Sequence, residues 1–241
     1  MKKNKIMLSV VSGLLVATVA VGGTLAYLSD KSNMVTNTFN VGSGYEWDED
    51  HEHQGLWLDE IDIDGKDEEG NPAERTEIGN TYGEILPGTQ VQKDPTFHLT
   101  ANSTDSYVFA EVTGVDAMIG QSYLFSDTEI VETEAAFTNN FSANWQKVDG
   151  EDGFDGLWVY GTLVDGEIVP TKVVSNKGEE AADFDLDAMF NYVKLSQKVE
   201  NTAFDQMDTD SIVIRGVAVQ WANLTMTEAQ AEAVKVLAAN P

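Results

Sequence analysis

The sequence contains no cysteine, and this absence sets the first limit on the chemistry that the chain can carry. Without thiols there is no disulfide, no thiolate nucleophile and no cysteine-ligated zinc site. Histidine is also scarce, with three residues in 241, namely His51, His53 and His98. The zinc-protease motif HExxH does not occur, and no serine carries the flanking glycines of a GxSxG nucleophile elbow. The sequence therefore predicts a protein that is not an enzyme.

Lysine and arginine are few, since the chain has 14 basic and 41 acidic residues and a formal net charge of −27. Removal of residues 1–26, which carry three lysines and no acid, would lower this charge by three, to −30. Nucleic-acid binding is not expected, because contacts to phosphates depend on lysine and arginine. The charge instead favours cations and basic partners, and it makes self-association sensitive to salt and pH.

The chain also has no apolar run of the roughly 20 residues that a membrane-spanning helix needs. Its longest run, Ile6–Val21, is interrupted by small polar residues and follows three lysines. A flexible stretch of small residues, Gly22-Gly23-Thr24-Leu25-Ala26, comes next. This pattern predicts a signal peptide over residues 1–26, with cleavage between Ala26 and Tyr27, and hence a secreted protein. The alternative is an N-terminal anchor that is retained.

The residues after this segment alternate in the manner of a β-strand. Val35, Asn37, Phe39 and Val41 share one parity, and threonine or asparagine occupies the positions between them. Residues 46–84 are different, because they are rich in acids and are predicted to be mostly loop, with a short strand near Leu56.

The rest of residues 27–241 reads as one β-sandwich domain made of many short strands. Strand patterns cover 91–100, with Pro95 as an interruption, and also 106–115, 157–160 and 211–221. Asp165-Gly166 predicts a hairpin turn. Capping-box patterns begin at Ser126 and Thr225, and predict a helical insertion and a C-terminal helix. The predicted fold class is thus mainly β, with helical insertions, a C-terminal helix and an N-terminal signal helix.

Two groups of residues are candidate metal ligands. Asp59, Asp62, Asp64 and Asp67 resemble a loose calcium-binding loop, but the position of the bidentate glutamate in an EF-hand is Asn71. His51 and His53 would lie on one face of a strand, and imidazole is a common metal ligand. The alternative for both groups is a solvated acidic loop that binds no cofactor.

Three blocks of the sequence resemble the TasA/camelysin family of exported proteins of Gram-positive bacteria. The small-residue stretch Gly22–Ala26, followed by Asn37-Thr38-Phe39, is similar to the end of the family's signal peptide and its mature start. The second block resembles a family turn and strand, and consists of Pro87, Gly88, Lys93, Asp94, Pro95 and Thr96. The third block, Val217–Trp221, looks like the family's last core strand.

This resemblance implies a jelly-roll-like sandwich, released by a dedicated SipW-type signal peptidase into the extracellular matrix or onto the cell surface. It also implies head-to-tail fibres of a biofilm, in which a donor strand within 27–42 joins the sheet of the next subunit. Accessory matrix proteins are the other expected partners. Two alternatives remain: a monomeric, calcium-binding surface protein, and a metal-dependent protease, for which no catalytic residue can be assigned.

Overall fold

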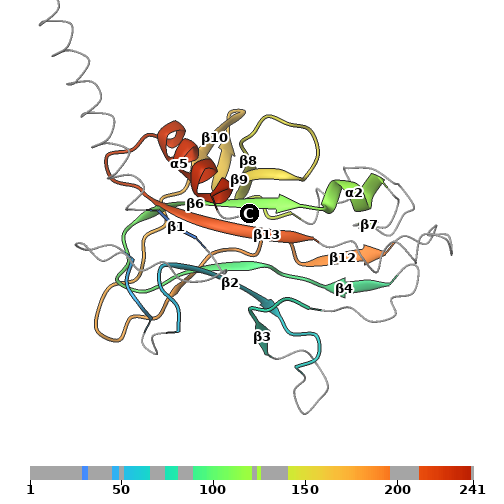
Figure 1. Cartoon of the computed structure of the whole chain (residues 1–241), viewed down its shortest axis with the longest axis horizontal. Helices are drawn as coiled ribbons and strands as arrows, with labels where there is room; N and C mark the ends of the chain where they lie inside the picture. Colours follow the sequence, from blue (N-terminus) through green and yellow to red (C-terminus); the bar gives the residue numbers. More distant parts are fainter. Residues whose placement is uncertain are drawn as a thin grey trace, which may run out of the picture.

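The computed structural model describes residues 29–31, 45–48, 52–65, 74–80, 89–120, 124–125, 141–195 and 212–239. This part of the chain is mainly β, with antiparallel sheets and a C-terminal helix, as predicted (Figure 1). None of the helices in the described ranges is long and apolar enough to cross a membrane.

The largest sheet has six strands and contains the longest ones. In spatial order they are β1 (Ser29–Lys31), β13 (Val213–Gln220), β6 (Ser106–Thr113), β9 (Gly156–Val164) and β10 (Glu167–Pro170), and β8 (Trp145–Lys147) also pairs with β9. The hairpin between β9 and β10 turns at Asp165 and Gly166, whose φ angles are 52° and 85°. Positive φ at both central residues is what a tight two-residue turn requires, so the Asp-Gly prediction is confirmed.

Two smaller sheets lie on the opposite side of the large sheet from the C-terminal helix (Figure 1). The first has the order β11 (Phe184–Asp185), β5 (Thr96–Leu99), β2 (Leu56–Ile61) and β3 (Arg75–Thr76). The second has the order β4 (Gln90–Gln92), β12 (Tyr192–Leu195) and β7 (Leu124–Phe125). A short helix, α2 (Val115–Gly120), follows β6.

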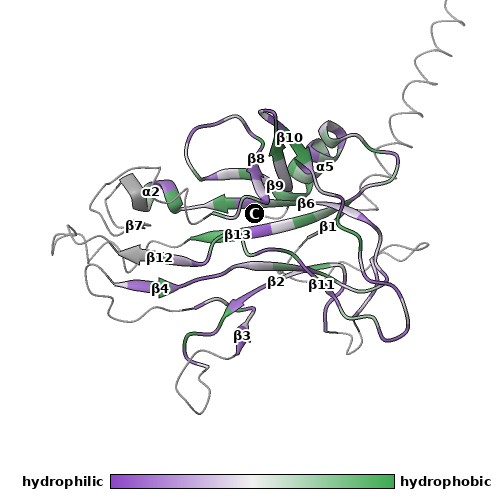
Figure 2. Ribbon diagram, turned by 180° about the vertical axis from the view of Figure 1, so that it is seen from behind, coloured by the Kyte–Doolittle hydropathy of each residue, from purple (hydrophilic) through white to green (hydrophobic). Residues whose placement is uncertain are grey.

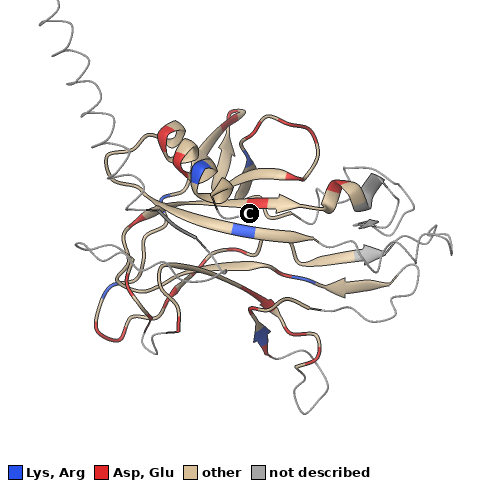
Figure 3. Cartoon of the chain, viewed as in Figure 1, with Lys and Arg blue, Asp and Glu red and all other residues tan. Residues whose placement is uncertain are grey.

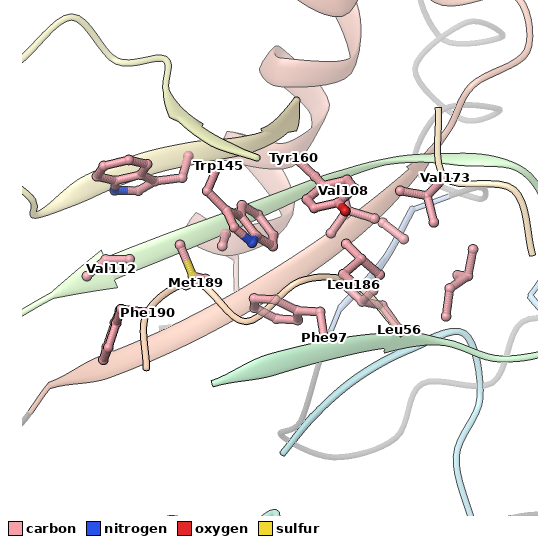
Figure 4. Close-up of a cluster of buried hydrophobic side chains, with 14 of the residues drawn as sticks. Leu56, Phe97, Val108, Val112, Trp145, Tyr160, Val173, Leu186, Met189 and Phe190 are labelled. Carbon is pink, nitrogen blue, oxygen red and sulfur yellow. The ribbon is translucent and has the colours of Figure 1, made fainter. Parts of the chain in front are cut away.

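The main core lies between the large sheet and the four-stranded sheet (Figure 4). Leu56, Phe97 and Leu99 come from the smaller sheet, and all three are fully buried. Alternate residues of the large sheet, such as Val108 and Ala110, meet them from the other side. Two sheets joined by interdigitated apolar side chains make a sandwich-like arrangement.

The other face of the large sheet is covered by α5 (Met226–Ala238). Ala229, Ala233 and Leu237 of this helix pack with Phe109 and Val217, so the middle of β6 and β13 is buried on both faces. In Figure 2, hydrophobic residues colour parts of α5, β6 and β13. The predicted capping box is confirmed at the start of the helix. There Glu228 donates its backbone N–H to the Thr225 hydroxyl at 3.3 Å, and Thr225 donates its own to the Glu228 carboxylate at 2.8 Å.

Two segments differ from the sequence prediction. Residues 91–100, predicted as one interrupted strand, form β4 and β5 in two different sheets, because Pro95 cannot donate a hydrogen bond to a ladder. The acidic region 46–84, predicted as mostly loop with a short strand near Leu56, contains that strand as β2 and also contributes β3, which was not predicted, to the four-stranded sheet. The predicted helix that begins at Ser126 lies outside the described residues.

Candidate functional site

The outer face of the four-stranded sheet carries a polar row rather than an apolar one. Alternation along β2 points Leu56 and Leu58 into the core and Trp57 and Asp59 away from it. The register places His98 of β5 directly opposite Trp57. The same register places Asp185 of β11 on the other side of His98. Residues that are far apart in sequence are therefore aligned across three strands.

Trp57 is stacked between two imidazole rings. The ring centroids of His53 and Trp57 are 4.1 Å apart, with an angle of 14° between the planes. Those of Trp57 and His98 are 4.0 Å apart, with an angle of 19°. The indole N–H of Trp57 donates to Asp183 at 2.9 Å, which fixes the position of the central ring. Aromatic faces attract cations, so this stack is suited to imidazoles that carry a proton.

Each histidine has a carboxylate at both ring nitrogens. His53 bonds Asp48 through Nδ1 at 2.7 Å and Glu77 through Nε2 at 2.6 Å. His98 bonds Asp185 through Nδ1 at 2.8 Å and Asp59 through Nε2 at 2.8 Å. A neutral imidazole has one N–H and one lone pair, whereas an ionised carboxylate only accepts. Both rings therefore satisfy their partners only as imidazolium cations.

These seven residues, His53, Trp57, His98, Asp48, Asp59, Glu77 and Asp185, are called the histidine cluster below. Burial by itself lowers the pKa of His98, but the carboxylates of Asp59 and Asp185 outweigh it and raise this pKa above its usual value. Burial likewise opposes the charge of His53, and Glu77 and Asp48 raise its pKa. The pKa of Asp59 is lowered, because His98 and Arg75 outweigh the effect of its burial.

Arg75 links the histidine cluster to the Lys93–Thr96 motif. Its guanidinium lies 2.7 Å from Asp59 Oδ1 and 3.0 Å from Asp94 Oδ2. The second oxygen of Asp94 accepts the backbone N–H of Ile61 at 2.7 Å. Pro95 is buried, and its carbonyl accepts the N–H of Met189 at 3.0 Å. The motif therefore connects β2, β3 and the segment before β12, which gives Asp94 and Pro95 structural roles.

Three of the predicted metal ligands, Asp59, Asp62 and His53, bond other groups of the protein. Asp59 bonds His98 and Arg75, and Asp62 accepts the N–H of Asp64 at 2.9 Å. His53 belongs to the histidine cluster, while Asp67 and His51 lie outside the described residues. Within the described ranges, no group of three or more histidine, aspartate or glutamate side chains is arranged to hold a metal ion.

Other predicted site residues also lie outside the described residues. They are the cleavage residues Ala26 and Tyr27, the donor-strand residues Val35, Asn37, Phe39 and Val41, and the turn residues Pro87 and Gly88. The described segment that lies between the cleavage residues and the donor-strand residues in sequence is β1. It pairs with β13 in the register Ser29 to Val219 and Lys31 to Val217.

His98, Asp48, Glu77 and Asp185 were missed as members of one site by the sequence analysis. The sequence contained one sign of this site, the alternation of side chains between the two faces of a strand. It places Trp57 and Asp59 on one face of a predicted strand, and His98 on the face opposite to Phe97 and Leu99. Parity does not give the register between strands, and the register is what brings these residues together. Comparison with family models, curated proteins and solved structures finds no match to this chain.

Proposed function

We propose that the chain is a secreted, non-enzymatic structural protein of a biofilm matrix or cell surface, built on a jelly-roll-like sandwich. It assembles into fibres when the N-terminal strand of one subunit pairs with the sheet of the next. The observation that supports this most is the place of β1, a three-residue strand at the edge of the large sheet. It lies just beyond the predicted cleavage site after Ala26.

An edge strand at a chain end is easily exchanged between subunits. Among the described strands its backbone pairs with β13 alone, in a ladder with Val217–Val219, so the same hydrogen bonds form whether the strand comes from its own chain or another. The predicted donor-strand residues, from Val35 to Val41, follow β1 closely along the sequence. A strand passed from each subunit to the next does not close on itself, and therefore produces a filament.

The surface charge explains why such assembly needs to be controlled. Acidic residues are spread over the loops, β2 and α5, and basic residues are few (Figure 3). After removal of residues 1–26 the net charge is −30, so subunits repel one another, and salt or a lower pH weakens that repulsion. Assembly should therefore be fastest in acid or at high ionic strength.

Engineered disulfides test this proposal, because the chain has no cysteine of its own. Cysteines at Lys31 and Val217, which are paired residues of β1 and β13, should join within one chain in the monomer. After fibre formation by protein starting at Tyr27, the same pair should join different chains and give a ladder on non-reducing gels.

Cysteines at Thr162 and Val169 provide the matched control. These residues are paired within the β9–β10 hairpin, so this disulfide should stay within the chain in monomer and fibre alike. Protein truncated at Gly42 should form no fibres. Fibres in which the Lys31–Val217 pair stays within the chain would contradict strand donation. A protein that stays monomeric in acid and at high salt would favour a monomeric surface protein.

A further inference from the structure

A lysine, a glutamate and an asparagine meet at the inner end of β2. Glu60 is 5% exposed and has the same parity as Leu56 and Leu58, which pack in the core. Its Oε2 accepts a hydrogen bond from Lys93 Nζ at 2.6 Å, and its Oε1 accepts one from Asn80 Nδ2 at 2.9 Å. One carboxylate therefore bonds an amine through one oxygen and a side-chain amide through the other.

The surroundings of Asn80 fix the orientation of its amide. Nδ2 lies 2.7 Å from the carbonyl oxygen of Ile61, which only accepts. Oδ1 lies 3.0 Å from the backbone N–H of Ile63, which only donates. The backbone N–H of Asn80 donates to Glu60 Oε1 at 2.9 Å as well. The amide carbon is thus flanked by a donor at its oxygen and by acceptors at its nitrogen.

We propose that Lys93 and Asn80 form an intramolecular isopeptide bond, with Glu60 moving the protons. The arrangement has the parts that an acyl transfer needs: a nucleophile in contact with a base, an electrophile that bonds the same base, and a donor where negative charge develops. The Lys93 side chain is only 13% exposed, so few waters compete for its amine. The inference does not depend on fibre formation.

The reaction is balanced by the loss of one ammonium ion. Glu60 takes a proton from the Lys93 ammonium, and the neutral Nζ attacks the amide carbon of Asn80. Negative charge on Oδ1 is stabilised by the N–H of Ile63. Glu60 then gives its proton to the departing nitrogen and takes one from Nζ, the bond from the carbon to Nδ2 breaks, and ammonia leaves. Ammonia takes the last proton from Glu60, which restores the carboxylate.

Mass spectrometry of the full chain tests the proposal directly. The bond lowers the mass by one ammonia, about 17 Da. A glutamyl endopeptidase cuts after Glu77, Glu84 and Glu111, and so places Asn80 and Lys93 on separate fragments. These two fragments should remain joined in the native protein, as one branched peptide. A chain with its full sequence mass and two separate fragments, after long incubation at neutral pH, would overturn the proposal.

Variants assign the roles of the three residues. K93R should have its full sequence mass, because a guanidinium is not a nucleophile at neutral pH. E60Q should also lack the deficit of about 17 Da, since it cannot accept the proton of the amine. K172R is the matched control, because Lys172 bonds only the Asp105 carboxylate among the ion pairs of the described residues, and it should keep the full deficit. A deficit that persists in K93R would also overturn the assignment.

Discussion

Replacing His98 by glutamine tests whether the histidine cluster stabilises the fold through an imidazolium. The His98 side chain is 8% exposed and donates to Asp59 and Asp185 at 2.8 Å each. Hydrogen bonds to charged groups contribute about 1.5–3 kcal/mol each, and glutamine retains at most one of these two without the charge. We expect a loss of about 3 kcal/mol, equivalent to about 6–12 °C in Tm for a chain of this length.

The same cluster should make stability depend on pH in the neutral range. Carboxylates raise the pKa of both His53 and His98 in the folded protein, so the folded state keeps protons that the unfolded chain releases above its ordinary pKa of 6.5. Their contribution is fully present below that value and is lost as the pH rises through the raised folded pKa. Between the two pKa values the loss is about 1.4 kcal/mol per pH unit for each histidine.

Few other groups titrate in this range, which makes the measurement clean. The chain has no cysteine, and the third histidine is His51. Urea unfolding followed by tryptophan fluorescence, from about pH 6 to about pH 9, should show stability falling with pH, as linkage requires. The double variant H53Q/H98Q should be nearly flat, and K172Q should follow the native protein. Equal slopes in the native protein and the double variant would refute the reasoning.

Three further predictions concern the framework around the site. T225A removes the side-chain half of the capping box and should lower stability by about 1 kcal/mol, measured by urea unfolding. G216A should cost about 1–3 kcal/mol, because its Cβ would lie 2.2 Å from the buried ring of Phe97, and a crystal structure should show that ring displaced. Burial and the hydrogen bond to Asp187 raise the pKa of Tyr160 to about 12, so an ultraviolet titration of the native protein should show one more late-titrating tyrosine than the same titration of Y160F.

Local patterns predicted local structure well. The Asp165-Gly166 turn and the capping box at Thr225 depend on neighbouring residues, and both are confirmed. The strand within 211–221 was recognised from apolar residues on both parities, because β13 is covered by the core on one face and by α5 on the other. These features need no knowledge of which strands pair.

The sites could not be predicted in the same way, because they depend on long-range register. His98 meets Asp59 across 39 residues and Asp185 across 87. The acidic region was predicted from its charge to be mostly loop with a short strand near Leu56. Asp59 and Glu60 are buried in that strand, each with a cationic partner supplied by another strand or loop. A count of charges along the sequence does not show that Arg75 and Lys93 neutralise these two buried carboxylates. Asp59, one of the predicted calcium ligands, is bound by His98 and Arg75, and no pattern in the sequence indicated either contact.

The short segment Lys93–Pro95 connects the histidine cluster with the group formed by Glu60, Lys93 and Asn80. Each of its three consecutive residues has a different role in that connection. Asp59 and Glu60 are neighbours on β2 and point to opposite faces of the sheet, as alternation requires. Asp94 binds Arg75, the partner of Asp59 in the histidine cluster, while Lys93 binds Glu60 on the inner side. Pro95 then ends the ladder of one sheet before β5 begins in another. His98 bonds Asp59 of β2, and Glu60, the next residue of β2, bonds both Lys93 and Asn80. Loss of the proton from His98 should therefore disturb β2 at Glu60, and we expect the rate of isopeptide formation to change with pH for this reason.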